Sequence, residues 1–273
     1  MRPPDRCSWW LGVALLALAA LPASAQRRGR ERGERIRIAP GLEADFSVNN
    51  VPYDGRVTFV RLRYTPERMG YGGGGGYFGG INYQWDHDYP RADTHLMTML
   101  RELTTFATNT TGTDILAVDD PELMKHPVAY LVEAGFWTMT DDEVVHLRNY
   151  LLKGGFLIFD DFIGPYPWYN LTRQLQRVLP DGRPVQLDAS HPIFHSFFEI
   201  NELNHRHPYA GTPSQFWGIF EDNDPAKRLL MIINRDNDIG ESWEWSDSGY
   251  IPIDLSDEAY KLGVNYMVYA ATH

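Results

Sequence analysis

The stretch from Val128 to Phe162 constrains the fold of this chain more than any other. It contains two short apolar segments, Val128–Val132 and Phe156–Phe159, which are typical of strands buried on both faces. The residues between them have the pattern of a helix. Two buried strands joined by a helical crossover form the unit of a parallel α/β sheet. The second strand ends in Asp160-Asp161, at the sheet edge where such folds bind ligands.

The helix between these strands has clear start and stop signals. Thr140, followed three residues later by Glu143, predicts a capping box, in which each side chain bonds the other residue's backbone. Gly154 and Gly155 predict the end of the helix, because glycine readily adopts the left-handed conformation that closes many helices.

Strand and helix patterns alternate through most of the remaining chain. We expect the first strand at Val57–Tyr64, a later helix at Trp168–Leu179, and a last helix that starts at Ser256. This alternation predicts one α/β domain over residues 57–273, a three-layer sandwich with a mainly parallel sheet.

The first 56 residues have a different character. A basic start, an apolar run at residues 9–21 and the small residues Ala23-Ser24-Ala25 form the pattern of a secretory signal peptide. We expect residues 1–25 to be removed and the protein to be periplasmic or secreted, with no stable membrane span. An uncleaved membrane anchor is the alternative. Residues 26–56 are expected to form an Arg-rich linker and N-terminal extension.

Charge and cysteine content exclude several classes of function. Without residues 1–37, the chain has 17 basic side chains against 33 acidic ones. This balance argues against a nucleic acid partner, because phosphate binding needs a basic surface. The one cysteine, Cys7, lies in the expected signal peptide, so the mature chain would have no disulfide, thiolate metal ligand or cysteine nucleophile.

Several distinctive blocks follow one another along the chain. They are FVRLRYTP, WDHDYPRAD, the stretch from DPELMKHP to LIFDD, DASHPIFHSFF, FWGIFED and LGVNYMVYA. Over about residues 57–271 the chain thereby resembles a bacterial family known as domain of unknown function 4159. The resemblance implies export and a flavodoxin-like sandwich similar to class I glutamine amidotransferases. The resemblance says nothing about which reaction or cofactor to expect, and no motif in the sequence requires a cofactor.

The resemblance also permits one negative inference about Asp160 and Asp161. In amidotransferase-like enzymes the nucleophile follows a central strand, and that position falls here at Asp160-Asp161-Phe162, without Cys or Ser. A carboxylate at a strand end can bind a metal, act as a base, or cap the next helix. Both acids are therefore candidate catalytic residues, with a structural turn as the alternative.

A group of histidines provides a candidate metal site. His191 and His195 lie four residues apart and, together with Asp161, would form a mixed imidazole and carboxylate site for zinc, iron or manganese. His191 is also a candidate catalytic residue. The alternative is that His191 caps a turn and His195 packs in the core, since the spacing matches no established zinc motif.

Aromatic residues beside acids suggest a carbohydrate site. Trp85, Asp88 and Trp137 are candidate ligand-binding residues, because sugar rings stack on aromatic faces while their hydroxyls bond to carboxylates. A two-carboxylate pair of the glycosidase type would come from four acids near two tryptophan-containing loops, namely Asp86, Asp88, Glu241 and Glu244. Ordinary core packing of the tryptophans is the alternative.

Two arginines on the first strand could meet an anionic ligand. Arg61 and Arg63 lie on the same side of an extended segment, and Arg63 is nearer its carboxyl end. Arg63 is therefore the favoured ligand-binding residue, as is His195 beyond its possible metal role.

Two functional hypotheses follow. The first is an exported α/β domain that binds a small polar ligand or an envelope protein partner without catalysis, because no complete catalytic motif is present. The second is a hydrolase, metal-dependent or not, that acts on a carbohydrate or related polar substrate. It requires Asp160 or Asp161 to lie close to His191 in one cleft.

Overall fold

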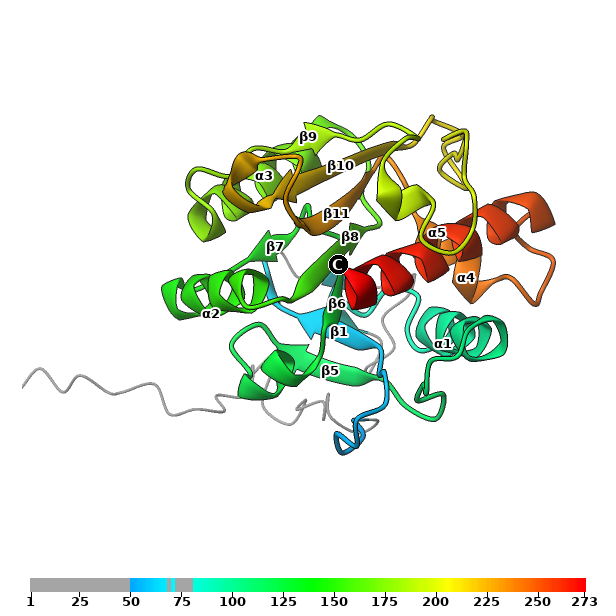
Figure 1. Cartoon of the computed structure of the whole chain (residues 1–273), viewed down its shortest axis with the longest axis horizontal. Coiled ribbons are helices and arrows are strands. Elements are labelled where there is room, and N and C mark those ends of the chain that lie inside the picture. The colour runs from blue at the N-terminus through cyan, green and yellow to red at the C-terminus, as the bar shows by residue number, and fades with distance from the viewer. Residues whose placement is uncertain (1–49, 68–69, 72–80) are drawn as a thin grey trace, which may run out of the picture. The chain divides into compact units, whose positions relative to one another are not determined.

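The computed structural model describes residues 50–67, 70–71 and 81–273 (Figure 1). The expected signal peptide and most of the N-terminal extension lie outside these residues. In the described part of the chain, none of the helices combines the length and apolar character that a membrane-spanning segment requires.

A seven-stranded sheet forms the centre of the structure, in the order β5-β1-β6-β8-β11-β10-β9. From β5 to β11 neighbouring strands are parallel, whereas β10 and β9 are antiparallel additions at one edge. The predicted mainly parallel sheet is thus confirmed. The strands are β1 (Val60–Arg63), β5 (Asp114–Ala117), β6 (Val128–Val132), β8 (Phe156–Asp160), β9 (Val185–Gln186), β10 (Gln215–Phe220) and β11 (Leu229–Arg235).

Helices cover both faces of this sheet, which gives three layers (Figure 1). One face carries α1 (Arg91–Leu103), α4 (Ile239–Glu244) and α5 (Ile253–Thr272), which pack against one another, and the other carries α2 (Asp141–Leu152) and α3 (Pro165–Val178). Short 3-10 helices and two-residue strand pairs complete the described chain: η1 (Pro121–Lys125), η2 (Pro192–Phe194), η3 (Glu221–Asn223), β2 (Thr65–Pro66) with β7 (Trp137–Thr138), and β3 (Gly70–Tyr71) with β4 (Ile81–Asn82).

The strand order reverses beside β1. The chain passes from β1 to β5 on one side of it, and then crosses to β6 on the other side. Connections that leave neighbouring parallel strands in opposite directions open a crevice at their carboxyl ends, where ligands bind in open α/β sheets.

The crossover helix α2 begins and ends as its sequence predicts. Thr140 Oγ1 accepts the Glu143 N–H at 3.2 Å, and Glu143 Oε2 accepts the Thr140 N–H at 2.6 Å, which completes the capping box. Gly154 has φ of +114°, and a Cβ on Gly155 would lie 2.5 Å from the Tyr150 ring. Both glycines are therefore required at this turn.

Three element boundaries differ from the predictions. Val57 forms only an isolated bridge, so the first strand begins at Val60. Helix α3 begins at Pro165 and α5 at Ile253, each three residues before the predicted start. Pro165 is the first residue of α3 and Pro252 directly precedes α5, and the fixed φ of proline suits the start of a helix. The short helix α4 was not predicted.

Candidate functional site

The candidate site lies at the carboxyl ends of the parallel strands. Glu133 directly follows β6, and Asp161 directly follows β8. Asp238 comes shortly after β11 and immediately before α4. His87 and Asp88 belong to the turn that precedes α1. Four separate segments thus supply side chains to one edge of the sheet.

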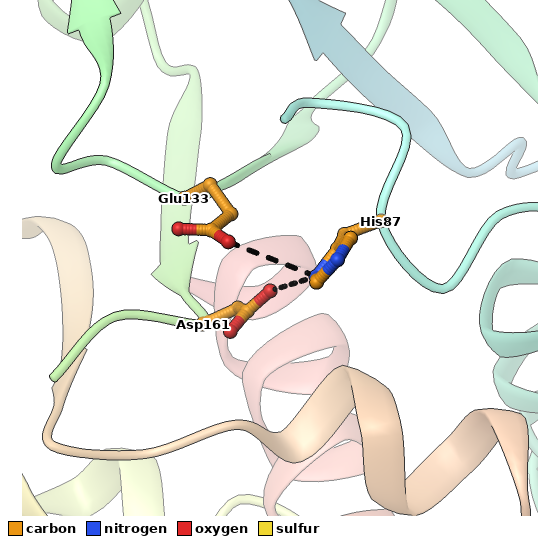
Figure 2. A group of neighbouring side chains, drawn as sticks. All are labelled: His87, Glu133 and Asp161. Atoms are coloured by element: carbon orange, nitrogen blue, oxygen red, sulfur yellow. Dashed lines mark hydrogen bonds and ion pairs between the residues drawn. The ribbon is translucent and has the colours of Figure 1, made fainter. Parts of the chain in front are cut away.

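His87, Glu133 and Asp161 form the centre of this site and point toward one another (Figure 2). Nδ1 of His87 lies 2.8 Å from Oδ2 of Asp161 and 3.8 Å from Oε1 of Glu133. The three donor atoms all lie within 4.8 Å of one another. The imidazole is 29% exposed, so the group can be reached from solvent.

More carboxylates stand behind this group. Asp88, Asp161 and Asp238 form a second set of donors within 4.8 Å, and Asp88, Glu241 and Glu244 form a third. We call the six acids of the three sets, together with His87, the acid cluster; they are Asp88, Glu133, Asp161, Asp238, Glu241 and Glu244. Asp88 is buried, and its Oδ2 has no hydrogen-bond partner among the described residues. A buried carboxylate oxygen without a donor is costly unless a proton or a cation compensates it.

Gly240 allows this close approach of helix α4. A Cβ at this position would lie 2.5 Å from Asp88 Oδ2 and 2.6 Å from the Tyr130 hydroxyl. Glycine is therefore the residue that fits between the acid cluster and the sheet.

The backbone at the site is strained. Asp88, Glu133, Asp161 and Asp236 have φ of +61°, +52°, +54° and +55°, in the left-handed region that non-glycine residues rarely adopt. Each such residue costs on the order of 1–3 kcal/mol, and strain of this kind gathers at functional sites. The Tyr64 hydroxyl donates to the carbonyl groups of Val132 (3.0 Å) and Glu133 (2.9 Å), which holds one of these turns in place.

Arg61 fixes the turn that carries His87. It is fully buried, forms an ion pair with Asp93, and donates from Nη1 to the carbonyl oxygens of Trp85 (3.1 Å) and His87 (2.8 Å). Its guanidinium also lies 5.2 Å from the centre of the Tyr130 ring. The favoured arginine of the sequence analysis, Arg63, is half-buried at the end of β1, and burial lowers its pKa despite the charges of Asp119, Asp120 and Glu143.

Asp160 and Asp161 have different surroundings. Oδ2 of Asp160 accepts the Tyr130 hydroxyl (2.8 Å) and the backbone N–H groups of Ile239 (3.0 Å) and Gly240 (2.9 Å). Asp160 is fully buried, and burial raises its pKa to about 7, an effect that the charge of Asp161 increases and these donors oppose. Asp160 thus ties β6, β8 and α4 together, whereas Asp161 faces His87.

The electrostatics of the acid cluster follow from burial and from like charges. The hydrogen bond to Asp161 raises the pKa of His87 to about 10, against the effect of burial. Burial raises the pKa of Glu133 to about 8, and the charge of Asp161 adds to this. Burial likewise raises the pKa values of Asp88 and Asp238. The cluster therefore holds more carboxylates than its cationic partners compensate.

His191 does not lie near Asp161. The His191 ring lies 5.6 Å from the Phe220 ring and 5.9 Å from the Tyr269 ring, and its Nδ1 accepts the Ile193 N–H at 3.2 Å. Phe220 pairs with Leu229, where β11 begins, so His191 lies toward the opposite edge of the sheet. The expected pairing of His191 with Asp161 is therefore not found, because His191 caps η2, as the alternative held.

The other predicted residues divide between the site and the core. His195 is bonded locally, to Glu199 Oε2 at 2.7 Å and the Ala189 carbonyl at 2.6 Å, and so does not join Asp161 in a metal site. Trp85 and Trp137 are buried and pack against Tyr83 and Phe159, so neither offers a free face to a ligand. Core packing, the alternative for these tryptophans, describes both.

Of the predicted site residues, Asp88 and Asp161 converge, with Asp160 beside them. Of the four acids suggested for a two-carboxylate pair, Asp88, Glu241 and Glu244 converge, whereas Asp86 is fully buried and is not part of that group. His87, Glu133 and Asp238 were not singled out in the sequence. Glu133 and Asp238 do carry a signal, because each is an acid that closely follows an apolar strand pattern.

Comparison with known proteins identifies the family. No curated protein matches the chain. The family model described as "Domain of unknown function (DUF4159)" matches residues 58–271, which is most of the chain and includes every residue of the acid cluster. The chain therefore belongs to the DUF4159 family.

Proposed function

We propose that this protein binds a divalent cation through His87, Glu133 and Asp161, and that the cation in turn binds a small polar ligand. One observation carries the proposal: an imidazole and two carboxylates from three separate segments present donor atoms within 4.8 Å of one another. A mixture of imidazole and carboxylate ligands suits zinc, iron or manganese.

The surroundings of the three residues support a cation. Asp88 and Asp238 lie next to Asp161, and one buried oxygen of Asp88 has no hydrogen-bond partner among the described residues. Three protein ligands leave further coordination positions open, as in sites where a metal binds a ligand or water. His87 is held from behind by the bond between its carbonyl group and Arg61, which is the kind of support that fixes ligand orientation.

The strand order supports a finer description of the fold. We propose a flavodoxin-like sandwich, because the parallel strands, numbered along the chain, follow the order 2-1-3-4-5 across the sheet. In that arrangement the ligand lies where the strand order reverses, which is beside β1 and β6 and hence beside Glu133. A relation to the class I glutamine amidotransferase-like fold is part of the same proposal.

Hydrolysis is the second candidate function, and backbone strain favours it. Asp161 and Glu133 both have left-handed backbones directly after a strand, and such strain accompanies precise placement of reacting groups. A bound metal would supply an activated water, and Asp88 with Glu241 would be the nearby carboxylates that accept its proton. Hydrolysis of p-nitrophenyl glycosides or esters that requires metal and is lost in Asp161→Asn would establish it.

Export is part of the proposal as well. The pattern of residues 1–25 favours a periplasmic or secreted protein, where divalent cations and polar envelope components would be available.

Elemental analysis and calorimetric titration with Zn²⁺ and Mn²⁺ test the metal site. We expect about one equivalent in the wild type and at least about tenfold weaker binding in His87→Ala and Asp161→Asn, since a ligand is lost in each. His195→Ala is the matched control. His195 Nδ1 lies 2.7 Å from Glu199 Oε2, a similar histidine–carboxylate contact that does not belong to the acid cluster. A wild type without affinity for either cation, or equal loss in the control, contradicts the proposal.

A further inference from the structure

Four aromatic rings form a strip that the proposed metal site does not use. His207, Tyr209, Tyr250 and Trp245 follow one another, with ring centres 6.3, 6.3 and 5.6 Å apart. We call these four residues the aromatic strip. Tyr209 is 56% exposed and Tyr250 is 63% exposed.

The Trp245 end of the aromatic strip adjoins the acid cluster. Trp245 directly follows Glu244, and its backbone N–H donates to the Glu241 carbonyl oxygen at 3.2 Å. Burial lowers the pKa of His207, and the charges of Asp161 and Asp236 partly oppose this effect, so the His207 end lies within electrostatic range of Asp161. The strip therefore borders the cluster at Trp245, and a molecule on the rings of Tyr250 and Trp245 would lie next to the carboxylates of Glu241 and Glu244.

Local contacts hold the strip in place. Nδ1 of His207 accepts the backbone N–H groups of Tyr209 (3.3 Å) and Ala210 (3.4 Å). The Arg91 guanidinium lies 4.9 Å from the centre of the Trp245 ring and is itself paired with Asp247. The exposed tyrosines are thus attached to a fixed base, and little ordering would be needed when a ligand binds.

We infer that the rings of the aromatic strip that reach the surface, Tyr209, Tyr250 and Trp245, bind the sugar units of a neutral oligosaccharide, with its hydroxyl groups directed at the acid cluster. This inference rests on the proposed function, whose polar ligand it specifies as a carbohydrate. Aromatic faces pack against the apolar faces of sugar rings, and carboxylates accept hydrogen bonds from hydroxyl groups. The carboxylates of the cluster disfavour phosphorylated or sulfated ligands, which carry the same charge.

Calorimetric titration with neutral hexasaccharides tests the inference. The probes are the β-1,4-linked and β-1,3-linked hexamers of glucose, the β-1,4-linked hexamer of xylose, and the β-1,4-linked hexamer of N-acetylglucosamine. We expect at least one to bind, and Tyr250→Ala and Trp245→Ala to weaken binding roughly five- to tenfold through loss of stacking. Tyr250→Phe, which keeps the ring, should bind within about twofold of the wild type.

Tyr53→Ala is the matched control, because Tyr53 is 49% exposed and packs against His126 and Lys125 rather than the strip. The inference is overturned if no hexamer binds, or if Tyr250→Ala and Trp245→Ala bind as well as the control. Metal titration of the same samples separates the two claims. If the protein binds sugar but no metal, the inference about the aromatic strip is supported and the proposed metal site is wrong. If it binds metal but no sugar, the metal site is supported and the inference about the strip is wrong.

Discussion

The Tyr130 hydroxyl and Oδ2 of Asp160 lie 2.8 Å apart between neighbouring strands, in the fully buried centre of the molecule. The same oxygen accepts two backbone N–H groups from the start of α4. Two adjacent aspartates that are equivalent in the sequence therefore have separate tasks: Asp160 connects the sheet to a helix, and Asp161 faces the site.

This separation predicts that substituting Asp160 lowers stability much more than substituting Asp161. Asp160→Ala leaves three buried donors without an acceptor and should lower the free energy of unfolding by on the order of 3 kcal/mol. Asp161→Asn should lower it by less, about 1–2 kcal/mol, because His87 loses its charged partner while asparagine tolerates a left-handed backbone and one like charge is removed. Urea unfolding followed by tryptophan fluorescence measures both. Equal losses of stability would mean that the division of tasks is wrong.

Arg61 should be essential for both stability and the position of His87. Arg61→Met leaves Asp93 buried without its partner and should lower the free energy of unfolding by about 3–5 kcal/mol. The double variant Arg61→Met/Asp93→Leu should recover part of this loss, because the uncompensated charge is gone. It should not recover metal affinity, since the carbonyl groups of Trp85 and His87 still lack their donor. Full recovery of metal affinity would show that Arg61 does not position His87.

Gly240 should tolerate no side chain. In Gly240→Ala the new methyl group would meet Asp88 and Tyr130, and repacking at a site this close should cost about 1–3 kcal/mol and weaken metal binding. Gly249→Ala provides the comparison, because that glycine has φ of +73° but open space around it. Its cost should be about 1–2 kcal/mol of backbone strain alone, with metal affinity unchanged. Thermal unfolding and the metal titration give the two quantities.

His205 should make the protein less stable in mild acid. Burial lowers its pKa in the folded protein to about 4, against a smaller upward effect of Asn237, whereas the unfolded chain has the ordinary value of 6.5. The unfolded state therefore binds more protons between pH 6.5 and 4, and the free energy of unfolding falls over this range as the pH falls, by up to about 3 kcal/mol.

The variant His205→Leu isolates this effect from the acids of the cluster. A raised pKa, such as about 8 for Glu133 against 4.5 in the unfolded chain, acts in the other direction, so its contribution to stability decreases as the pH rises from 4.5 to 8. Urea unfolding at several pH values between 4 and 7 should show that the wild type loses more stability than the variant as the pH falls. Parallel profiles would contradict the assignment.

The fold was more accessible from the sequence than the site. The apolar strands β6 and β8 and the capping box at Thr140 are local patterns, so the parallel α/β unit could be predicted from them. Asp161 could be found because it ends one of these strands. Glu133 could have been connected with it, because Glu133 ends the other strand of the same parallel pair. His87 could not, because it lies in an irregular turn before α1 whose position is set by tertiary contacts such as the bond from Arg61, and these leave no local pattern.

For the histidines, closeness in sequence suggested a shared site that the structure does not show. His191 and His195 are close in sequence, which suggested a shared ligand, but each is satisfied by neighbours within a few residues. The histidine that meets Asp161 is His87, which is separated from it by 74 positions.

That separation has a consequence for folding. A contact over 74 positions closes a long loop, and Asp160 meets the start of α4 over a further 79. Long-range contacts of this kind form late, because the entropy of closing each loop is lost before the contact stabilises the chain. The donors at the sheet edge therefore come together only when strands from both halves of the domain have docked in their final order. Metal affinity would then report the completion of folding, and a partly folded chain with most of its helices already formed would not yet bind.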